Sequence, residues 1–170
     1  MGYTTLPSVV LNGELESFLD VLSDTIPFDI LVTSGIRTPE KQALAMFKKI
    51  ELGDDLIKIY RDDTFAQSII DAYPDVENAT KIVERYASSG GGSSHLRGQG
   101  VDLRTRDKTP EEIEIMKKAV ENLGEFALVE TKPPHLHITI KKKYGKSNQI
   151  SPKIIIGLVL IGLGWSIWKK

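Results

Sequence analysis

The chain has three histidines, and each stands near a carboxylate or another histidine in the sequence. His95 precedes Asp102 in the stretch SSHLRGQGVDLRT, and His135 and His137 are two positions apart in PPHLHITI. The chain has no cysteine, so any metal must be held by His, Asp and Glu side chains. Two imidazoles and one carboxylate, with a fourth position left open, are typical of a catalytic zinc site. These residues therefore predict zinc as a cofactor.

The local pattern around these residues indicates how they meet. His135 and His137 occupy alternate positions of an expected strand, so both side chains point to one face and the intervening aliphatic residues point into the core. Asp102 stands between two aliphatic residues of another short strand, where a carboxylate is costly unless it has a charged partner or a metal. His95 follows the flexible stretch GGGSS, which can bring its imidazole near Asp102.

Hydrophobic spacing and helix signals predict the elements that must position the site. Thr109, followed by Pro110, indicates the start of a helix that Gly124 ends. Further helices are expected over residues 14–26, 38–52, 54–60, 62–73 and 75–89, and strands over 28–35, 100–105, 125–130 and 135–142. The last two strands are expected to form an antiparallel pair. The mixture predicts an α+β domain, a small antiparallel sheet with flanking helices.

Charge is distributed unevenly along the chain. The first 140 residues carry 15 basic and 23 acidic side chains, whereas the remainder carries seven lysines and no acidic residue. An acidic body of this kind argues against nucleic acid as a partner.

The motifs around the histidines resemble those of a known enzyme family. The pattern S-x-H-x-x-G-x-x-x-D, formed by Ser93, His95, Gly98 and Asp102 and followed by H-x-H, resembles the zinc D-Ala-D-Ala peptidases of peptidase family M15. These include peptidoglycan carboxypeptidases and phage endolysins. The stretch SGIRTPEKQ, residues 34–42, is similar to an upstream signature of the family, and VETKPPHLHI resembles the Hedgehog signalling domain, which shares the fold. The resemblance covers residues 28–140.

The resemblance implies a role for each matched residue. Its expected zinc ligands are His95, Asp102 and His137. His135 would lie beside the metal and support the oxyanion or the substrate, and Glu130 would be the catalytic base, with Glu125 the nearest other carboxylate.

The same resemblance implies substrate-binding residues upstream of the histidines. Arg37 would hold a substrate carboxylate or carbonyl, since its planar guanidinium suits paired hydrogen bonds; a surface arginine in a turn is the alternative. Ser93 could bond near the site or be a plain loop serine. Gln42 could face the cleft or be a solvated helix position.

The C-terminal residues differ in character from the rest. Residues 154–168, IIIGLVLIGLGWSIW, carry no charge, and residues 141–153 form a basic linker. Fifteen helical residues extend only about 22 Å, but flanking lysines can snorkel and the run is apolar on every side. We expect a transmembrane helix that anchors a peptidase domain, residues 1–140, by a single C-terminal pass in a host or virion membrane; a buried C-terminal helix is the alternative. The N-terminal ten residues lack the pattern of a secretory signal.

Together these features predict a membrane-anchored zinc metallopeptidase that cleaves peptidoglycan stem peptides or cross-links, as an endopeptidase or a D-Ala-D-Ala carboxypeptidase. A phage lysis protein or a virion entry enzyme would fit this description. Two other functions stay open. One is a non-catalytic zinc-binding recognition module, for which Glu130 near the metal is not needed. The other is a structural membrane protein with the same fold.

Overall fold

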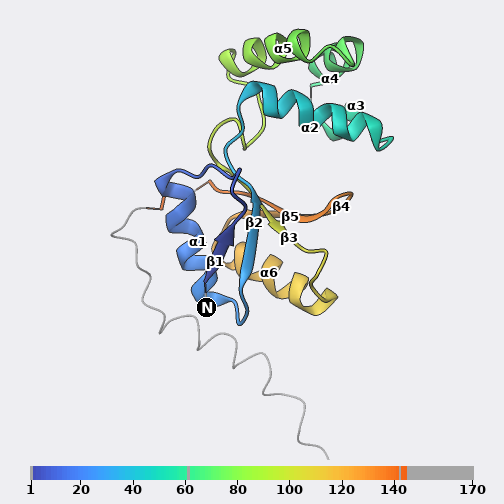
Figure 1. Cartoon of the computed structure of the whole chain (residues 1–170). Coiled ribbons are helices and arrows are strands. Elements are labelled where there is room, and N and C mark those ends of the chain that lie inside the picture. Colours follow the sequence, from blue (N-terminus) through green and yellow to red (C-terminus); the bar gives the residue numbers. More distant parts are fainter. Residues whose placement is uncertain (1, 61, 142, 145–170) are drawn as a thin grey trace, which may run out of the picture.

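The computed structural model describes residues 2–60, 62–141 and 143–144, which form five strands and six helices (Figure 1). The α+β class predicted from the sequence is confirmed. Figure 1 shows helices α2 to α5 gathered on one side of the sheet, and α1 and α6 on the other.

A five-stranded sheet with the order β1-β2-β3-β5-β4 carries the fold. Its strands are β1 (Tyr3–Thr5), β2 (Ile30–Ser34), β3 (Gly100–Arg104), β4 (Phe126–Thr131) and β5 (Pro134–Thr139). Neighbouring strands are antiparallel except β1 and β2, which are parallel. The sheet is therefore mixed, not wholly antiparallel as expected. The sequence does not predict β1, because three residues are too few to show an alternating pattern.

The described residues form six helices, two of which begin at capping residues that the sequence indicates. They are α1 (Gly13–Thr25), α2 (Pro39–Glu51), α3 (Leu56–Ile59), α4 (Asp63–Ala72), α5 (Val76–Ser88) and α6 (Pro110–Asn122). The Thr38 side chain accepts a hydrogen bond from the Lys41 amide, and Thr109 and Glu112 form a reciprocal capping box. The predicted helix starts at Thr38 and Thr109 are thus confirmed.

One apolar core lies between the sheet and helices α1 and α6. Its fully buried members come from both layers and include Phe18, Leu22, Val101, Leu103, Met116, Leu136 and Ile138. In β3 and β5 these apolar residues alternate with Asp102 and His137, so the candidate ligands stand on the opposite face of the sheet. The core thus fixes which way the site faces.

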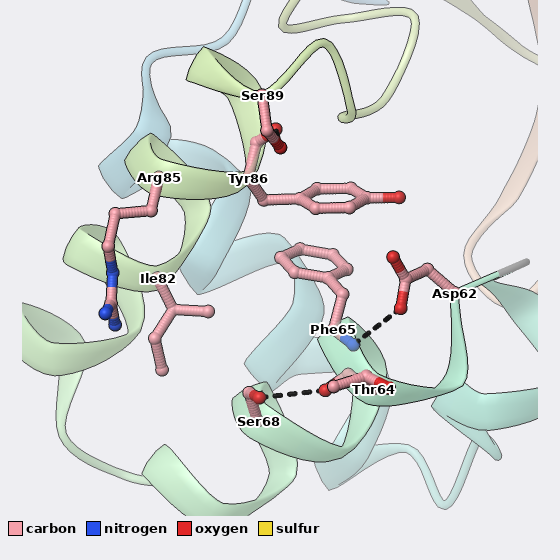
Figure 2. A pocket seen from close by; sticks show the side chains of 8 residues that line it. All are labelled: Asp62, Thr64, Phe65, Ser68, Ile82, Arg85, Tyr86 and Ser89. Carbon is pink, nitrogen blue, oxygen red and sulfur yellow. Dashed lines mark hydrogen bonds between the residues drawn. The ribbon is translucent and has the colours of Figure 1, made fainter.

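A second apolar core lies within the helical insert between β2 and β3, helices α2 to α5. Its members include Met46, Phe47, Leu56, Ile69 and Val83. At its edge the rings of Phe65 and Tyr86 stack with centroids 3.9 Å apart, beside a shallow hollow between α4 and α5 (Figure 2). The insert therefore has its own interior.

Within residues 2–60, 62–141 and 143–144, no helix combines the length and the apolar character needed to cross a bilayer. The apolar segment 154–168, expected to span a membrane, lies outside the described residues, as does most of the basic linker.

Candidate metal centre

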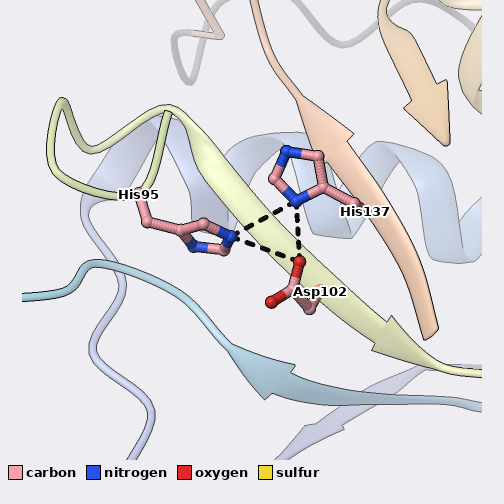
Figure 3. Close-up of side chains that lie close together, drawn as sticks. All are labelled: His95, Asp102 and His137. Atoms are coloured by element: carbon pink, nitrogen blue, oxygen red, sulfur yellow. Dashed lines mark hydrogen bonds and ion pairs between the residues drawn. The ribbon is translucent and has the colours of Figure 1, made fainter. Parts of the chain in front are cut away.

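Three side chains converge on the face of the sheet that points away from the α1–α6 core: His95, Asp102 and His137 (Figure 3). One potential ligand atom from each lies within 4.8 Å of the other two. Asp102 Oδ1 is 2.8 Å from His137 Nδ1 and 3.2 Å from His95 Nε2, and the two ring nitrogens are 3.3 Å apart. Two nitrogens and one carboxylate oxygen at this spacing could hold a metal ion.

Strand register accounts for two of the three positions. Asp102 on β3 is paired with His137 on β5, so their side chains are neighbours on the same face. The next pair along, Leu103 with Leu136, is fully buried in the core. The alternation expected for both strands is confirmed.

The loop before β3 supplies the third position. His95 is only 3% exposed, and its Nδ1 lies 2.6 Å from the carbonyl oxygen of Gly35. A carbonyl oxygen can only accept, so Nδ1 donates to Gly35 and Nε2 is the ring nitrogen that faces the cluster. A Cβ on Gly100 would lie 2.6 Å from the His95 amide nitrogen. Glycine at that position lets the loop close against the strand.

His137 is oriented by hydroxyl groups on its far side. Ser94 Oγ and Thr139 Oγ1 each lie 3.2 Å from His137 Nε2. A hydroxyl can donate or accept, so these contacts suit both tautomers of the ring. With Nε2 protonated, Nδ1 is free to bind a metal, which is the usual way in which outer contacts prepare a histidine ligand.

Asp102 is buried, 4% exposed, and is held as an anion. Its Oδ2 accepts from Arg37 Nη2 at 2.8 Å. Burial alone would raise the pKa of Asp102, but hydrogen bonds from His137 and His95 and the charge of Arg37 outweigh burial and hold that pKa well below its usual range. Oδ1 therefore faces the two imidazoles as a charged ligand atom.

Glu130 and His135 form the next pair outward on the same face. They are register partners on β4 and β5, with Glu130 Oε1 3.8 Å from His135 Nε2. His135 Nε2 is also 3.7 Å from Asp102 Oδ1, so His135 borders the cluster without joining it. Glu130 Oε2 accepts from Lys49 Nζ of α2 at 2.8 Å. The expected base is thus near the cluster and is tied to the helical insert.

The three expected substrate residues form a connected network. Arg37 donates to Ser34 Oγ at 3.0 Å as well as to Asp102, and its Nη1 lies 3.5 Å from Gln42 Oε1. Ser93 Oγ donates to the same Gln42 oxygen at 3.0 Å. Gln42 is 2% exposed, so the solvated alternative is wrong for this residue. Arg37 is engaged by the site instead of lying free in a turn.

The sequence does not predict four further side chains that lie near the site: Ser94, Thr139, Lys49 and Tyr60. Thr139 could have been found, because it follows His137 by two positions and shares its face. Ser94 is next to His95 in the sequence, but that position does not predict its contact with His137. Lys49 and Tyr60 belong to the insert and reach the site only through tertiary packing.

Apolar side chains border the cluster on the edge strand. Leu128 and Phe126 are each 46% exposed, and they are the register partners of His137 and Thr139. The face of the sheet therefore combines a polar cluster with an open apolar margin.

Glu125 lies elsewhere. Its carboxylate accepts from the Lys141 amide at 2.6 Å and from the Tyr144 hydroxyl at 2.8 Å, and it is 5% exposed. A carboxylate so engaged is a structural anchor for the end of the sheet.

Comparison with known protein families, with curated proteins and with solved structures finds no match to this chain.

Proposed function

We propose that the protein is a zinc metallopeptidase of the D-Ala-D-Ala peptidase type that hydrolyses peptide bonds in peptidoglycan. The observation that carries the proposal is the convergence of His95, Asp102 and His137, with one ligand atom of each within 4.8 Å of the others. The motif resemblance selects the same three residues independently of the geometry.

The donor set fits zinc. Two imidazole nitrogens and one carboxylate oxygen leave a fourth position open, as in catalytic zinc sites. Each ligand residue also has an outer partner: Gly35 for His95, Arg37 for Asp102, and the Ser94 and Thr139 hydroxyls for His137. A bound zinc would supply a Lewis acid and lower the pKa of a coordinated water to about 7.

Glu130 is the general base in this proposal. Its carboxylate is on the same face as the ligands, and Lys49 engages one oxygen while the other stays on the side of His135. A base in this position would take a proton from the attacking water and pass it to the leaving amine. His135 Nδ1 donates to the Pro133 carbonyl at 2.7 Å, so its Nε2 donates to substrate only when the ring carries both protons.

The substrate class follows from the resemblance and from the surface around the cluster. Stem peptides of peptidoglycan carry small apolar side chains and free carboxylates. The apolar margin formed by Leu128 and Phe126 suits the former, and Arg37, whose side chain is 23% exposed, suits the latter. Ser93 and Gln42 act by holding Arg37 and the loop in place.

Membrane attachment through residues 154–168 belongs to the same proposal. The lysines that precede this segment would add salt-sensitive attraction to anionic lipid, whereas burial of an apolar helix is insensitive to salt. The full-length protein should therefore stay in the membrane fraction after a high-salt wash.

A second function, recognition without catalysis, is favoured by one observation. Glu130 is paired with Lys49 at 2.8 Å and Arg37 with Asp102 at 2.8 Å, so two of the residues needed for catalysis already have partners within the protein. In a binding module these ion pairs would simply stabilise the fold around the metal.

Metal analysis and hydrolysis measured on the same preparation separate these functions. The full-length protein in detergent should contain one zinc per chain and release new amines from purified peptidoglycan. His95→Ala and Asp102→Ala should each lose both properties, whereas His135→Ala should lose activity and keep most of its zinc. Zinc without amine release would support the recognition module. Stoichiometric zinc in both ligand variants would reject the site itself.

A further inference from the structure

Tyr60, which follows α3 in the helical insert, lies at the end of a hydrogen-bonded chain that starts at the metal cluster. Asp102 bonds Arg37, Arg37 approaches Gln42 Oε1 at 3.5 Å, and Gln42 Nε2 donates to the Tyr60 hydroxyl oxygen at 3.2 Å. We propose that the Tyr60 hydroxyl donates a hydrogen bond to the substrate carbonyl oxygen that becomes negative during hydrolysis. This inference rests on the proposed peptidase function.

The hydrogen of that hydroxyl is available for the role. Gln42 Nε2 is a donor, so it occupies a lone pair of the Tyr60 oxygen and leaves the O–H group to find an acceptor. No acceptor for this hydrogen occurs among residues 2–60, 62–141 and 143–144. The orientation of Gln42 is in turn fixed, because its Oε1 accepts from Ser93. The Gln42 amide therefore orients the Tyr60 hydroxyl, and the hydroxyl hydrogen is not used in that contact.

The ring of Tyr60 is held by aromatic packing within the insert. It meets Phe65 edge-on with centroids 6.0 Å apart, and Phe65 stacks on Tyr86, as Figure 2 shows. A phenol supported in this way loses little conformational freedom when it binds a ligand.

Electrostatics agree with a place beside the site. Burial raises the pKa of Tyr60 to about 12, and the charges of Arg37 and Glu130 both act on it, the first lowering and the second raising that pKa. The hydroxyl therefore lies within electrostatic reach of two residues of the proposed site. It also stays protonated, and so remains a donor, throughout the neutral pH range.

The proposed contact involves no covalent change at Tyr60. As water adds to the scissile carbonyl, its carbon–oxygen double bond becomes a single bond and the oxygen gains negative charge. The phenol hydrogen bond strengthens as that charge grows, and its proton stays on the tyrosine throughout. A donor of this kind lowers the barrier because it binds the transition state better than the substrate.

Tyr60→Phe removes the hydroxyl and keeps the ring, so it is the direct test in the full-length, zinc-loaded protein. Loss of one such donor costs about 10²–10³ in kcat in known cases, and we expect a fall of about 100-fold with KM unchanged. Affinity for a phosphinate analogue of alanylalanine, whose tetrahedral group carries negative oxygens, should weaken to a similar extent. Tyr86→Phe is the matched control, because it deletes a hydroxyl from the same aromatic stack outside the hydrogen-bonded chain.

The outcomes separate this inference from the proposed function. Equal kcat and equal phosphinate affinity in wild type and Tyr60→Phe would overturn the role of Tyr60 and leave the peptidase intact. Parallel losses of zinc content and thermal stability in Tyr60→Phe would show that the hydroxyl only supports the fold, and would also overturn it. If the wild type cleaves no peptidoglycan, the proposed function fails. The phosphinate then decides for Tyr60: weaker binding by the variant supports the contact, and equal or absent binding rejects it.

Discussion

Arg37 Nη2 donates to Asp102 Oδ2 at 2.8 Å, on the opposite carboxylate oxygen from the one that faces the histidines. One carboxylate therefore serves two cations, the guanidinium on one side and the expected metal on the other. Arg37 couples the strand that carries the ligand to the start of the helical insert, since it also contacts Ser34 and Gln42.

Replacement of Arg37 by Ala should destabilise the metal-free protein more than the zinc-loaded protein. Without Arg37 a buried carboxylate loses its cationic partner, at a cost of about 2 kcal/mol. Bound zinc would compensate for part of that lost charge. Thermal unfolding of wild type and variant, each with chelator and with zinc, measures the difference. An equal loss in both states would show that Arg37 acts by packing alone.

Ser94→Ala should weaken zinc binding without abolishing it. Ser94 Oγ contacts the far nitrogen of His137, and loss of such outer contacts typically costs about 10- to 100-fold in metal affinity. Because Thr139 makes a second contact to the same nitrogen, we expect the single variant near the lower limit and Ser94→Ala/Thr139→Val beyond it. Competition with a chromogenic chelator gives the affinities. Ser93→Ala is the neighbouring control, since Ser93 bonds Gln42 and no ligand, and it should bind zinc as the wild type does.

Glu130→Gln should lower turnover while zinc stays bound. The amide preserves the shape of the side chain but cannot take a proton, and loss of general-base help costs about 10² to 10⁴ in rate. Cleavage of a cross-linked muropeptide, with metal content measured on the same samples, checks both parts. Unchanged turnover would remove Glu130 from the mechanism, and Glu125 could not take its place, because its two oxygens bond Lys141 and Tyr144.

Lys49 should act as a positioning residue for Glu130. Its ammonium lies 2.8 Å from Glu130 Oε2, with the two side chains 21% and 25% exposed. Lys49→Met should reduce kcat by about 10-fold with KM and zinc content unchanged, which is less than the loss of about 10² to 10⁴ for removal of the base, because Glu130 itself remains. Lys49→Arg should restore most of the rate, because it keeps the charge. Asp54→Asn, which alters a weaker partner 4.0 Å from the same ammonium, should have little effect. Equal losses of thermal stability in Lys49→Met and Lys49→Arg would indicate that Lys49 acts through packing and not through its charge.

The parts of the site that lie on strands could be predicted, because strand geometry is regular. The alternation of Asp102 and His137 with aliphatic neighbours is visible in the sequence, and both side chains fall on the expected face. Helix starts at Thr38 and Thr109 follow from capping chemistry, which acts over a few residues. Strand alternation and helix capping depend on residues that are close together in the sequence, so the sequence predicts them.

Contacts between the insert and the sheet could not be predicted. Lys49 and Glu130 are 81 positions apart, and nothing near either residue in the sequence indicates the other. Gln42 illustrates the same limit: its place on a helix is clear, but its burial depends on Ser93 and Tyr60, which come from separate elements. Strand β1 could not be predicted for another reason. Three residues are too few to show an alternating pattern, and the segment is a strand because it pairs with β2.

The two apolar interiors have no residue in common: one lies beneath the sheet and the other inside the insert. Two candidate ligands, Asp102 and His137, stand on strands that pack on the first, whereas Gln42 and Lys49 stand on a helix that packs into the second. An insertion or repacking in α3 to α5 therefore would not disturb the side chains beneath the ligands. It would, however, move Tyr60, whose ring packs on Phe65 of the insert. Under the proposed peptidase function, evolutionary change in the insert would therefore alter specificity and turnover together, while the metal ligands on the strands are inherited unchanged.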